Sequence, residues 1–309
     1  MPGTRRAVID VGTNSVKLLV ADVRDGMVEP VLEDSEQTRL GAGFYETHIL
    51  QSAAIADTAR SVAAFATRAK DLGSASTRVI ATSAARDAKN PGDLTSAIEK
   101  ASGLKVEIIS GEQEGDWAFQ GVATDPRLAG QPLLLMDAGG GSTEFVLGQG
   151  DQKYYRNSFS LGTVRLLEKM PPDDPPTLEQ RAACREWVKD FLTREVASEL
   201  SRALKQTPAQ LIGTGGTATI LGRMEAGLDS YDREKIEAVR LTRIKLGEWT
   251  DRLWSLPLAD RRQTVGLPSK RADVILMGLV IYEGTIDVFG FDSLRITTRG
   301  LRFAVVQAG

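Results

Sequence analysis

The sequence contains a single cysteine, Cys184, and a single histidine, His48, among its 309 residues. One thiol excludes an internal disulfide and is usual in the reducing cytoplasm. One histidine beside one cysteine also excludes a zinc site built from these side chains. His48 lies in the polar turn YETHIL, which favours a loop position over a catalytic one.

Long apolar runs are absent as well. The longest, from Val274 to Ile281, is far shorter than the roughly 20 residues that span a bilayer. The first ten residues, MPGTRRAVID, lack the apolar core of a secretory signal peptide. We therefore expect a cytoplasmic protein without a membrane partner.

The chain has no excess of positive charge: its formal net charge is −3, and it contains no recognisable nucleic-acid-binding module. We therefore expect no nucleic-acid partner. A polyanionic substrate would need a local basic lining, for which the sequence offers Lys17, Arg39, Arg86, Arg165, Lys270, Arg271, Arg299 and Arg302.

One short phrase occurs twice. IDVGTNSVKLLV, residues 9–20, and MDAGGGSTEFVL, residues 136–147, share an Asp, a Gly and a Ser at equivalent positions. Each reads as a strand, a tight polar turn and a second strand, which predicts a β-hairpin. Such turns bring backbone N–H groups close to a ligand. The candidate phosphate-binding residues are Thr13, Asn14, Ser15, Lys17, Gly139, Gly140, Gly141 and Ser142.

The alternative for each copy is an ordinary hairpin turn. The three glycines at residues 139–141 cost more backbone entropy than such a turn requires, which favours a functional turn. For Lys17 the alternative, an exposed strand lysine, stays open. The carboxylates Asp10 and Asp137, which end the first strand of each hairpin, could hold a divalent cation.

A third glycine loop, LIGTGGTATIL, predicts a strand that turns directly into a helix. Helix N-termini bind anions through free N–H groups and the helix dipole. No lysine follows at the spacing of a Walker loop, and a tight structural turn is the alternative. The candidate residues are Gly213, Thr214, Gly215, Gly216 and Thr217.

Two further candidates follow predicted strands. Glu112 and Glu114 lie in SGEQEG, where a carboxylate could deprotonate a water that attacks phosphorus. On local pattern alone, carboxylates that stabilise a helix N-terminus explain both better. Arg86 follows a strand in TSAAR and could bind phosphate through two N–H groups, with a surface ion pair as the alternative.

Strands and helices are interleaved, which indicates an α/β fold. We expect a helix over residues 52–72, with Gly73 ending it, and one that starts at Pro91 with Asn90 as its cap. Thr177 and Gln180 predict a capping box for a helix to about residue 204, with Leu178 on its buried face. The domain boundary is placed near residue 120, giving domains 1–120 and 121–300, with residues 301–309 joining the first.

Two hairpins and a strand–glycine loop–helix resemble the actin, Hsp70 and sugar kinase superfamily. That resemblance implies two ribonuclease H-like domains with an interdomain cleft. IDVGTNSVKLLVAD, RLGAGF, IATSAARDAKN, IISGEQEGDWAFQGV, LLLMDAGGGSTEFVLG, FSLGTVRLLE, LIGTGGTATIL and RITTRGLRFAVV, in this order, are similar to the exopolyphosphatase and guanosine pentaphosphate phosphohydrolase (Ppx/GppA) family. The similarity covers nearly the whole chain and is closest to short members without a C-terminal HD-type domain.

The resemblance assigns roles. It implies that Glu114 is the catalytic base and that Arg86 contacts phosphate near the attacked phosphorus. It also implies that Asp137 and Glu144 hold Mg²⁺ or Mn²⁺, to which the hairpin pattern adds Asp10 as a metal candidate. Gln113 and Gly115 stand where the family usually has Glu and Ala, which leaves open whether Glu112 or Glu114 faces the water.

The function expected from the resemblance is an exopolyphosphatase that releases orthophosphate from inorganic polyphosphate. A guanosine pentaphosphate 5'-phosphohydrolase is the alternative within the class, and a nucleotide kinase is a weaker one. A non-catalytic sensor of polyanions or nucleotides is the alternative outside it. The oligomeric state stays open, with a homodimer among the options.

Overall fold

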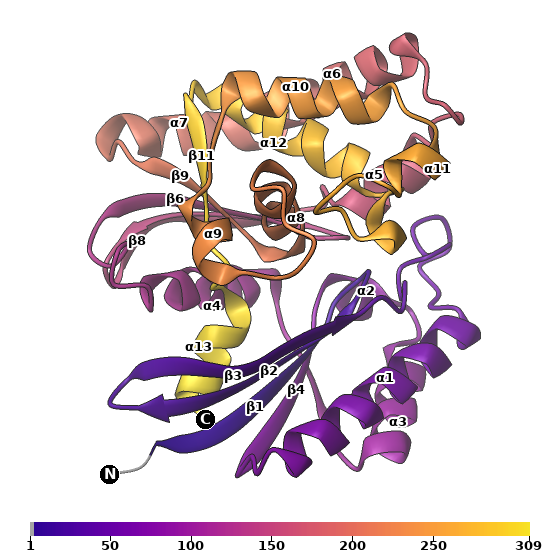
Figure 1. The fold of residues 1–309 in the computed structure, drawn as a ribbon, viewed down its shortest axis with the longest axis vertical. Helices are drawn as coiled ribbons and strands as arrows, with labels where there is room; N and C mark the ends of the chain where they lie inside the picture. Colours follow the sequence, from indigo (N-terminus) through magenta and orange to yellow (C-terminus); the bar gives the residue numbers. More distant parts are fainter. Residues whose placement is uncertain (1–2) are drawn as a thin grey trace. The chain divides into compact units, whose positions relative to one another are not determined.

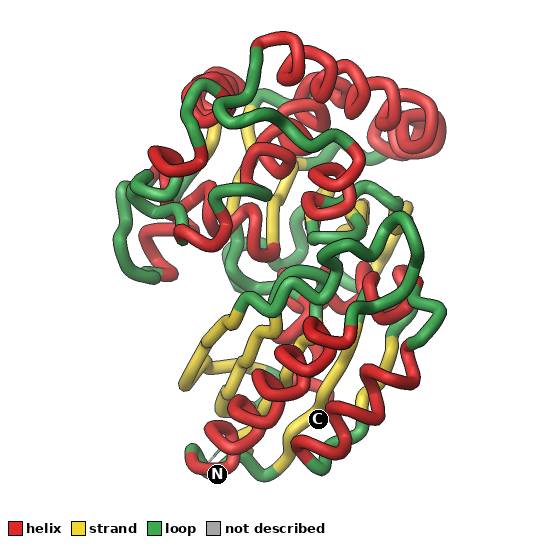
Figure 2. The backbone as a smooth tube through the Cα atoms, turned by 90° about the vertical axis from the view of Figure 1, so that its right-hand side faces the viewer, coloured by secondary structure: helices red, strands yellow, loops and turns green. Residues whose placement is uncertain are grey.

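The computed structural model describes residues 3–309. The chain forms two compact units, one from Met1–Arg127 with Arg299–Gly309 and the other from Leu128–Thr298. In each unit, helices flank a central sheet (Figures 1 and 2). No helix within residues 3–309 combines the length and apolar character that crossing a membrane requires.

The first unit contains a five-stranded sheet in the order β3-β2-β1-β4-β5. The first three strands are antiparallel, and β4 and β5 continue the sheet in parallel. Its strands are β1 (Thr4–Val11), β2 (Val16–Arg24), β3 (Met27–Glu36), β4 (Ser76–Ala81) and β5 (Val106–Ile108). Its helices are α1 (Ser52–Asp71), α2 (Ser83–Asp87), α3 (Pro91–Ser102), α4 (Gly111–Ala123) and α13 (Leu301–Ala308).

Both faces of this sheet are covered, because alternate residues of each strand point to opposite faces. Ile9 and Leu18 belong to an apolar cluster with residues of α1 and α3. Val8 and Leu19 belong to a second cluster with Phe303 and other residues of α13. The C-terminal helix is therefore part of the core of the first unit.

The second unit repeats this arrangement. Its sheet has the order β10-β11-β9-β6-β7-β8, with β6, β7 and β8 antiparallel and β9 and β11 parallel to β6. The strands are β6 (Pro132–Ala138), β7 (Thr143–Gln149), β8 (Gln152–Phe159), β9 (Gln210–Thr214), β10 (Arg240–Thr242) and β11 (Ser293–Ile296). The α/β fold expected from the sequence is confirmed by these two sheets.

The helices of the second unit surround one apolar cluster that includes the buried helix α12. They are α5 (Thr163–Lys169), α6 (Leu178–Phe191), α7 (Ala197–Gln206), α8 (Gly215–Glu225), α9 (Arg233–Ala238), α10 (Arg243–Trp254), α11 (Leu258–Arg261) and α12 (Ile275–Phe289). A π-helical turn, η1 (Leu192–Val196), joins α6 to α7, and η2 (Ser269–Arg271) is a 3₁₀ turn.

Two sequence predictions about helix starts need correction. Asn90 precedes α3, but its side chain does not cap the helix: its oxygen accepts from Leu50 N–H at 2.9 Å. Thr177 and Gln180 do form the expected capping box. Leu178, which was expected on the buried face, is 68% exposed. It is the first residue of α6 and lies outside the apolar cluster of the second unit.

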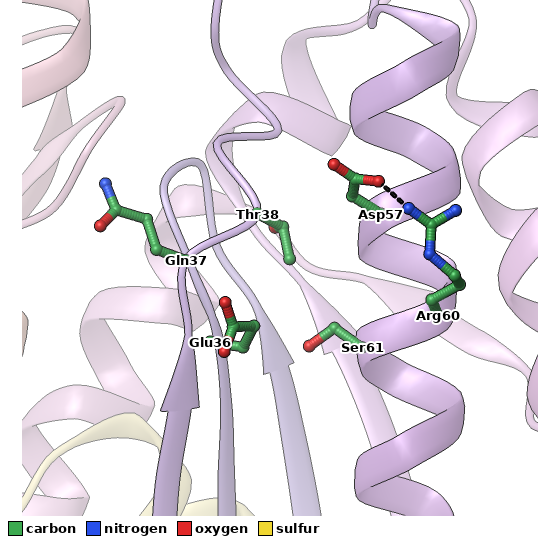
Figure 3. A pocket seen from close by; sticks show the side chains of 6 residues that line it. All are labelled: Glu36, Gln37, Thr38, Asp57, Arg60 and Ser61. Carbon is green, nitrogen blue, oxygen red and sulfur yellow. Dashed lines mark hydrogen bonds and ion pairs between the residues drawn. The ribbon is translucent and has the colours of Figure 1, made fainter. Parts of the chain in front are cut away.

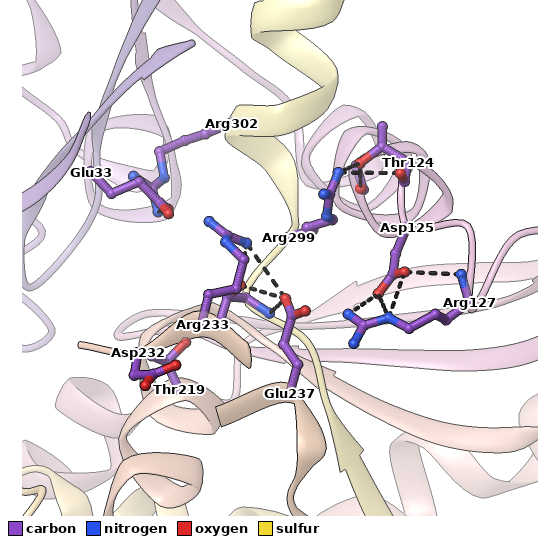
Figure 4. Close-up of polar contacts among 12 residues, drawn as sticks. Glu33, Thr124, Asp125, Arg127, Thr219, Asp232, Arg233, Glu237, Arg299 and Arg302 are labelled. Atoms are coloured by element: carbon purple, nitrogen blue, oxygen red, sulfur yellow. Dashed lines mark hydrogen bonds and ion pairs between the residues drawn. The ribbon is translucent and has the colours of Figure 1, made fainter. Parts of the chain in front are cut away.

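Polar contacts flank both positions at which the chain passes from one unit to the other (Figure 4). In the first unit Arg127 donates to both oxygens of buried Asp125, and Arg299 donates to Thr124. In the second unit Glu237 accepts from the backbone N–H of Thr298 at 3.0 Å and lies 3.5 Å from Arg233. Charged side chains therefore hold the chain on the first-unit side of both crossings, and Glu237 holds it on the second-unit side at Thr298.

Candidate functional site

The first predicted hairpin is formed by β1 and β2, with Asp10 paired opposite Lys17. Its turn closes through a hydrogen bond from Gly12 N–H to the carbonyl of Ser15 at 3.0 Å. The Lys17 ammonium lies 3.8 Å from one carboxylate oxygen of Asp10. Lys17 is therefore an ion-pair partner of Asp10, on the strand that returns from the turn.

Four polar atoms around this turn are buried and have no hydrogen-bond partner among residues 3–309: Asp10 Oδ1, Thr13 Oγ1, Asn14 Nδ2 and, on the neighbouring Gln37, Oε1. Buried polar groups in proteins are almost always paired, and an unpaired one costs about 1–3 kcal/mol. Such exceptions point to a missing ligand, here one that offers both acceptors and a cation.

The carboxyl ends of three parallel strands meet beside this turn. Asp10 is in register with Ile80 of β4, and Ala81 is in register with Ile108 of β5. Arg86 lies in α2, directly after β4, while Glu114 lies in the first turn of α4, after β5. The ends of adjacent parallel strands are the usual location of ligand sites in α/β sheets.

Arg86 and Glu114 contact one another. Arg86 Nη1 donates to Glu114 Oε2 at 2.9 Å and to the carbonyl of Ile109 at 3.2 Å. Its Nε lies 3.7 Å from Asp87. Arg86 Nη2 donates no hydrogen bond within the described residues, so its two N–H groups are available to a ligand.

Glu112 is exposed in the same first turn, whereas Glu114 is largely buried against Arg86. Ser110 caps this helix by accepting from Gln113 N–H at 3.1 Å. Both glutamates lie where the helix dipole favours a negative charge, so the structural role considered from the sequence fits both of them.

The second hairpin, β6 and β7, has the same turn as the first. Gly139 N–H donates to the carbonyl of Ser142 at 2.9 Å, which reproduces the contact between Gly12 and Ser15. Asp137 and Glu144 are directly opposed across the two strands. Cross-strand partners lie on the same face of a sheet, so the two predicted metal-binding carboxylates are neighbours.

The glycines of this turn are oriented by α5. The carbonyl of Gly139 accepts from Thr163 N–H at 2.9 Å, and that of Gly140 accepts from Val164 N–H at 2.8 Å. Because the C=O and N–H of one trans peptide point in opposite directions, the N–H groups of Gly140 and Gly141 point away from α5. Two adjacent donors with this orientation form an anion-binding concavity.

The two carboxylates of this hairpin have different surroundings. Glu144 is 1% exposed and accepts a hydrogen bond from Ser158 Oγ at 2.7 Å. Asp137 lies against Gly215, where an added Cβ would be 2.1 Å from the carboxylate oxygen Oδ1. Gly215 also has φ +79°, so no other residue fits this position without strain.

The third glycine loop is the strand-to-helix turn that was predicted. β9 ends at Thr214, which is in register with Asp137, and α8 begins at Gly215. The N-terminus of α8 and the turn of the second hairpin thus lie side by side, at the carboxyl ends of β9 and β6. Arg271 approaches this N-terminus, with Nη2 3.7 Å from the Cβ position of Gly216, and Thr217 Oγ1 donates to the carbonyl of Ala138 at 2.9 Å.

The buried phenol of Tyr282 contacts the carboxyl ends of both strands, β6 and β9. Its hydroxyl lies 3.5 Å from the carbonyl of Met136 and 3.4 Å from that of Thr214. Burial raises the pKa of Tyr282 well above its ordinary value, and the charge of Asp137 raises it further. The phenol therefore stays protonated, and its single O–H can donate to the carbonyl of either strand.

The donor set of the second unit fits a hard divalent cation. Within residues 3–309 no group of three or more Asp, Glu, His or Cys side chains could hold a metal ion alone. Mg²⁺ is commonly bound by one or two carboxylates together with waters and substrate phosphates. Asp137, Glu144 and the Ser158 hydroxyl supply oxygen ligands of this kind.

The single thiol and the single imidazole offer no competing chemistry. Cys184 is buried against Met277, and burial raises its pKa to about 12, so it is no nucleophile at neutral pH. His48 has φ +59° in a loop, with its ring 5.3 Å from that of Phe44.

The sequence did not predict three residues that lie next to the candidate site residues. Gln37 contacts Asn14, Ser158 contacts Glu144, and Arg271 lies near Gly216. Arg271 was only one of several scattered basic residues. Ser158 lies on β8, and Gln37 directly follows β3. Only the pairing of these strands with β7 and β2 brings Ser158 and Gln37 to the hairpins.

Comparisons with known proteins agree with these motifs. The chain is 33% identical to exopolyphosphatase 2 of Mycobacterium tuberculosis over 293 residues, covering 91% of this chain and 89% of that protein. It superposes on the crystal structure of the Aquifex aeolicus Ppx/GppA family member with a TM-score of 0.79 and 32% identity, covering 99% and 97% of the two chains.

A solved exopolyphosphatase from Cytophaga hutchinsonii, at 24% identity, shares the fold with a TM-score of 0.87 over 98% of this chain and 96% of that one. The predicted two-domain fold and the predicted class of enzyme, a phosphoanhydride hydrolase, are thereby confirmed. Residues 19–307 match the Ppx/GppA phosphatase family, and the chain belongs to that family.

Proposed function

We propose that this protein is an exopolyphosphatase, which removes the terminal phosphate of inorganic polyphosphate with water and Mg²⁺. The M. tuberculosis relative that is 33% identical carries this name, and the similarity extends over 91% of the chain. A phosphoanhydride substrate also suits the site, because backbone N–H groups, hydroxyls and arginines are phosphate ligands.

The contact between Arg86 and Glu114 is the observation that carries the proposal. Arg86 holds the carboxylate with Nη1 and keeps Nη2 for a ligand. A phosphate oxygen bound at Nη2 would place phosphorus beside the carboxylate. Glu114 is then the base, since Glu112 in the same turn is exposed and not held by this arginine.

In the proposed reaction a water oxygen attacks the terminal phosphorus in line with the bridging oxygen. Glu114 accepts the proton of this water as the new P–O bond forms and the bridging P–O bond breaks. Orthophosphate leaves, and the chain is shortened by one phosphate. Arg86 offsets the negative charge that spreads over the phosphoryl oxygens.

The second unit is proposed to bind the phosphates and the cation. Asp137 and Glu144 would hold Mg²⁺, which neutralises charge on the phosphoryl oxygens. The N–H groups of Gly140 and Gly141 and the N-terminus of α8 would donate to neighbouring phosphates. In the first unit, Asp10, Thr13, Asn14 and Ser15 are the proposed ligands of phosphate and cation.

The test is orthophosphate release from long-chain polyphosphate and from guanosine pentaphosphate, each with and without Mg²⁺. Both substrates end in the same phosphoanhydride, so the comparison decides between them. Mg²⁺-dependent release that is faster from polyphosphate supports the proposal. A preference for the nucleotide assigns the enzyme to guanosine pentaphosphate, and binding without release from either indicates a sensor.

A further inference from the structure

The turn of the first hairpin is held by a segment that follows β3. Gly41 N–H donates to the carbonyl of Thr13 at 2.7 Å, and Arg39 N–H donates to that of Asn14 at 3.1 Å. An added Cβ at Gly41 would lie 2.4 Å from Thr13 Cγ2, so the two segments are in close contact. Gln37, directly after β3, belongs to the same segment.

Gln37 also contacts the turn through its side chain. Gln37 Nε2 donates to Asn14 Oδ1 at 3.0 Å. Asn14 is 5% exposed, and its Nδ2 is one of the buried atoms that have no partner within residues 3–309. The amide of Asn14 is thus held by its oxygen, while its donor end is left for a ligand.

An amide presents either an acceptor or a donor to its surroundings, depending on its orientation. If both amides were reversed, their mutual hydrogen bond would remain, but Asn14 would present its oxygen to the site. A bound anion would be repelled by that oxygen and attracted by the N–H₂ group. Whichever group Gln37 offers to Asn14 therefore decides whether the turn attracts or repels a phosphate.

We propose that Gln37 is a positioning residue for substrate binding: its amide N–H₂ holds the oxygen of Asn14 and so directs the Asn14 N–H₂ group at a phosphate of the substrate. The inference rests on the proposed function, because it takes the substrate to be a phosphate chain. It assigns a role in phosphate affinity to a residue that itself makes no contact with phosphate.

A polar pocket of about 360 Å³ adjoins the same strand end and offers a control residue. It is lined by Glu36, Gln37, Thr38, Asp57, Arg60 and Ser61. Figure 3 shows the side chain of Gln37 pointing away from those of Ser61 and Asp57. Ser61 Oγ is buried without a partner in the described part of the chain, so Ser61→Ala removes a hydroxyl near Gln37 that does not contact Asn14.

The test uses Gln37→Glu and Gln37→Met in the full chain with Mg²⁺. An ionised glutamate only accepts, so Asn14 must turn its N–H₂ group towards residue 37 and present its oxygen to phosphate. We expect the KM for polyphosphate to rise about tenfold or more, as for loss of a hydrogen bond to a charged group, with kcat little changed. Gln37→Met, which only releases the amide, should raise KM less, and Ser61→Ala should leave it unchanged.

Added negative charge could also weaken phosphate binding, so Gln37→Glu is repeated in an Asn14→Ala background. A purely coulombic effect persists there at full size, whereas an effect that acts through the Asn14 amide largely disappears. Persistence of the full KM change would overturn the inference. So would a KM of Gln37→Glu within twofold of the wild type.

The outcome is separable from that of the proposed function. If the wild type hydrolyses polyphosphate and Gln37→Glu does not alter its KM, the inference is wrong and the proposed function stands. If the wild type releases no orthophosphate, the same variants are compared by calorimetric binding of tripolyphosphate. A weaker Kd that depends on Asn14 then supports the inference, and an unchanged Kd or no binding by the wild type overturns it.

Discussion

At the scale of single residues, the important side chains are those held by one partner and left open on another side. Arg86 donates to Glu114 through Nη1 while its Nη2 stays available within residues 3–309. Asn14 accepts from Gln37 while its Nδ2 has no partner there. A group fixed in this way meets a ligand without losing conformational freedom on binding, which favours affinity.

Arg86→Lys tests this double role. A lysine ammonium is a point charge and cannot hold a carboxylate and a phosphate in two fixed directions. We expect kcat/KM for polyphosphate to fall at least about tenfold, the equivalent of one charged hydrogen bond. Arg78→Lys is the control, because Arg78 pairs with Glu107 at the surface of the same unit at 2.7 Å. Equal activities of the two variants would contradict the role of Arg86.

Asp125 leads to a prediction about acid stability. Burial alone would raise its pKa, but hydrogen bonds and charge from Arg127 outweigh burial and lower the pKa below the ordinary value of 3.8. Its contribution to stability is therefore complete above the unfolded pKa and is lost as the pH falls through the folded value.

Asp125→Asn should lower the Tm at pH 7, and the loss of Tm between pH 5 and pH 3 should be smaller than in the wild type. Thermal unfolding followed by circular dichroism across this range measures both effects. An acid dependence identical to that of the wild type would show that Asp125 is not the group responsible.

At the scale of elements, the two hairpins, β1–β2 and β6–β7, have the same hydrogen-bonded turn. Gly12 with Ser15, and Gly139 with Ser142, close two hairpins through one hydrogen bond each, at 3.0 and 2.9 Å. The second hairpin is joined by the strand-to-helix turn at Gly215, which must leave room for Asp137.

Gly215→Ala should therefore impair metal binding. The new methyl group would displace the Asp137 carboxylate, and φ +79° adds backbone strain of about 1–2 kcal/mol. Gly227→Ala is a matched control, since Gly227 has φ +62° and nothing within 4 Å of its Cβ position. We expect both variants to lose Tm, Gly215→Ala more than Gly227→Ala because of the clash with Asp137, and a higher Mg²⁺ requirement for Gly215→Ala alone. The same Mg²⁺ dependence in both variants would contradict the account.

Local sequence signals predicted the elements that depend on local chemistry. The helix expected over residues 52–72, with Gly73 ending it, is α1, which ends at Asp71. The repeated Asp-x-Gly phrase located both hairpins. The helix expected from the Thr177 capping box to about residue 204 is confirmed, since the chain is helical without a break from Leu178 to Gln206. The π-helical turn inside it, Leu192–Val196, was not predicted.

Features that depend on pairing between distant segments were not accessible from the sequence. The third strands β3 and β8 have half-exposed, mixed patterns and were not predicted. Ser158 therefore could not be associated with Glu144. Likewise, the side chain of Asn90 is used by Leu50, 40 residues earlier in the chain, in place of its own helix.

At the scale of the whole molecule, two sheets share one topology. The strand order β3-β2-β1-β4-β5 of the first unit recurs as β8-β7-β6-β9-β11 in the second, which adds β10 at the edge. The second unit is a continuous segment with its own apolar cluster, whereas the first needs α13 to cover one face of its sheet.

Expression of the separate segments tests this organisation. Residues 128–298 alone should fold, with a cooperative thermal transition and dispersed amide resonances in NMR spectra. Residues 1–127 alone should aggregate, because the face of Val8 and Leu19 loses Phe303 and the rest of α13. Joining residues 299–309 to this segment through a flexible linker should restore its solubility. A soluble, cooperatively folded 1–127 segment would contradict the role of α13.

The central claim is that Glu114, held by Arg86, is the base of a phosphoanhydride hydrolase. The most direct test is orthophosphate release from polyphosphate by Glu114→Gln, with tripolyphosphate binding measured in parallel. Loss of a general base costs about 10²- to 10⁴-fold, so we predict a fall of kcat in this range with nearly unchanged Kd. Turnover within a few fold of the wild type would contradict the claim.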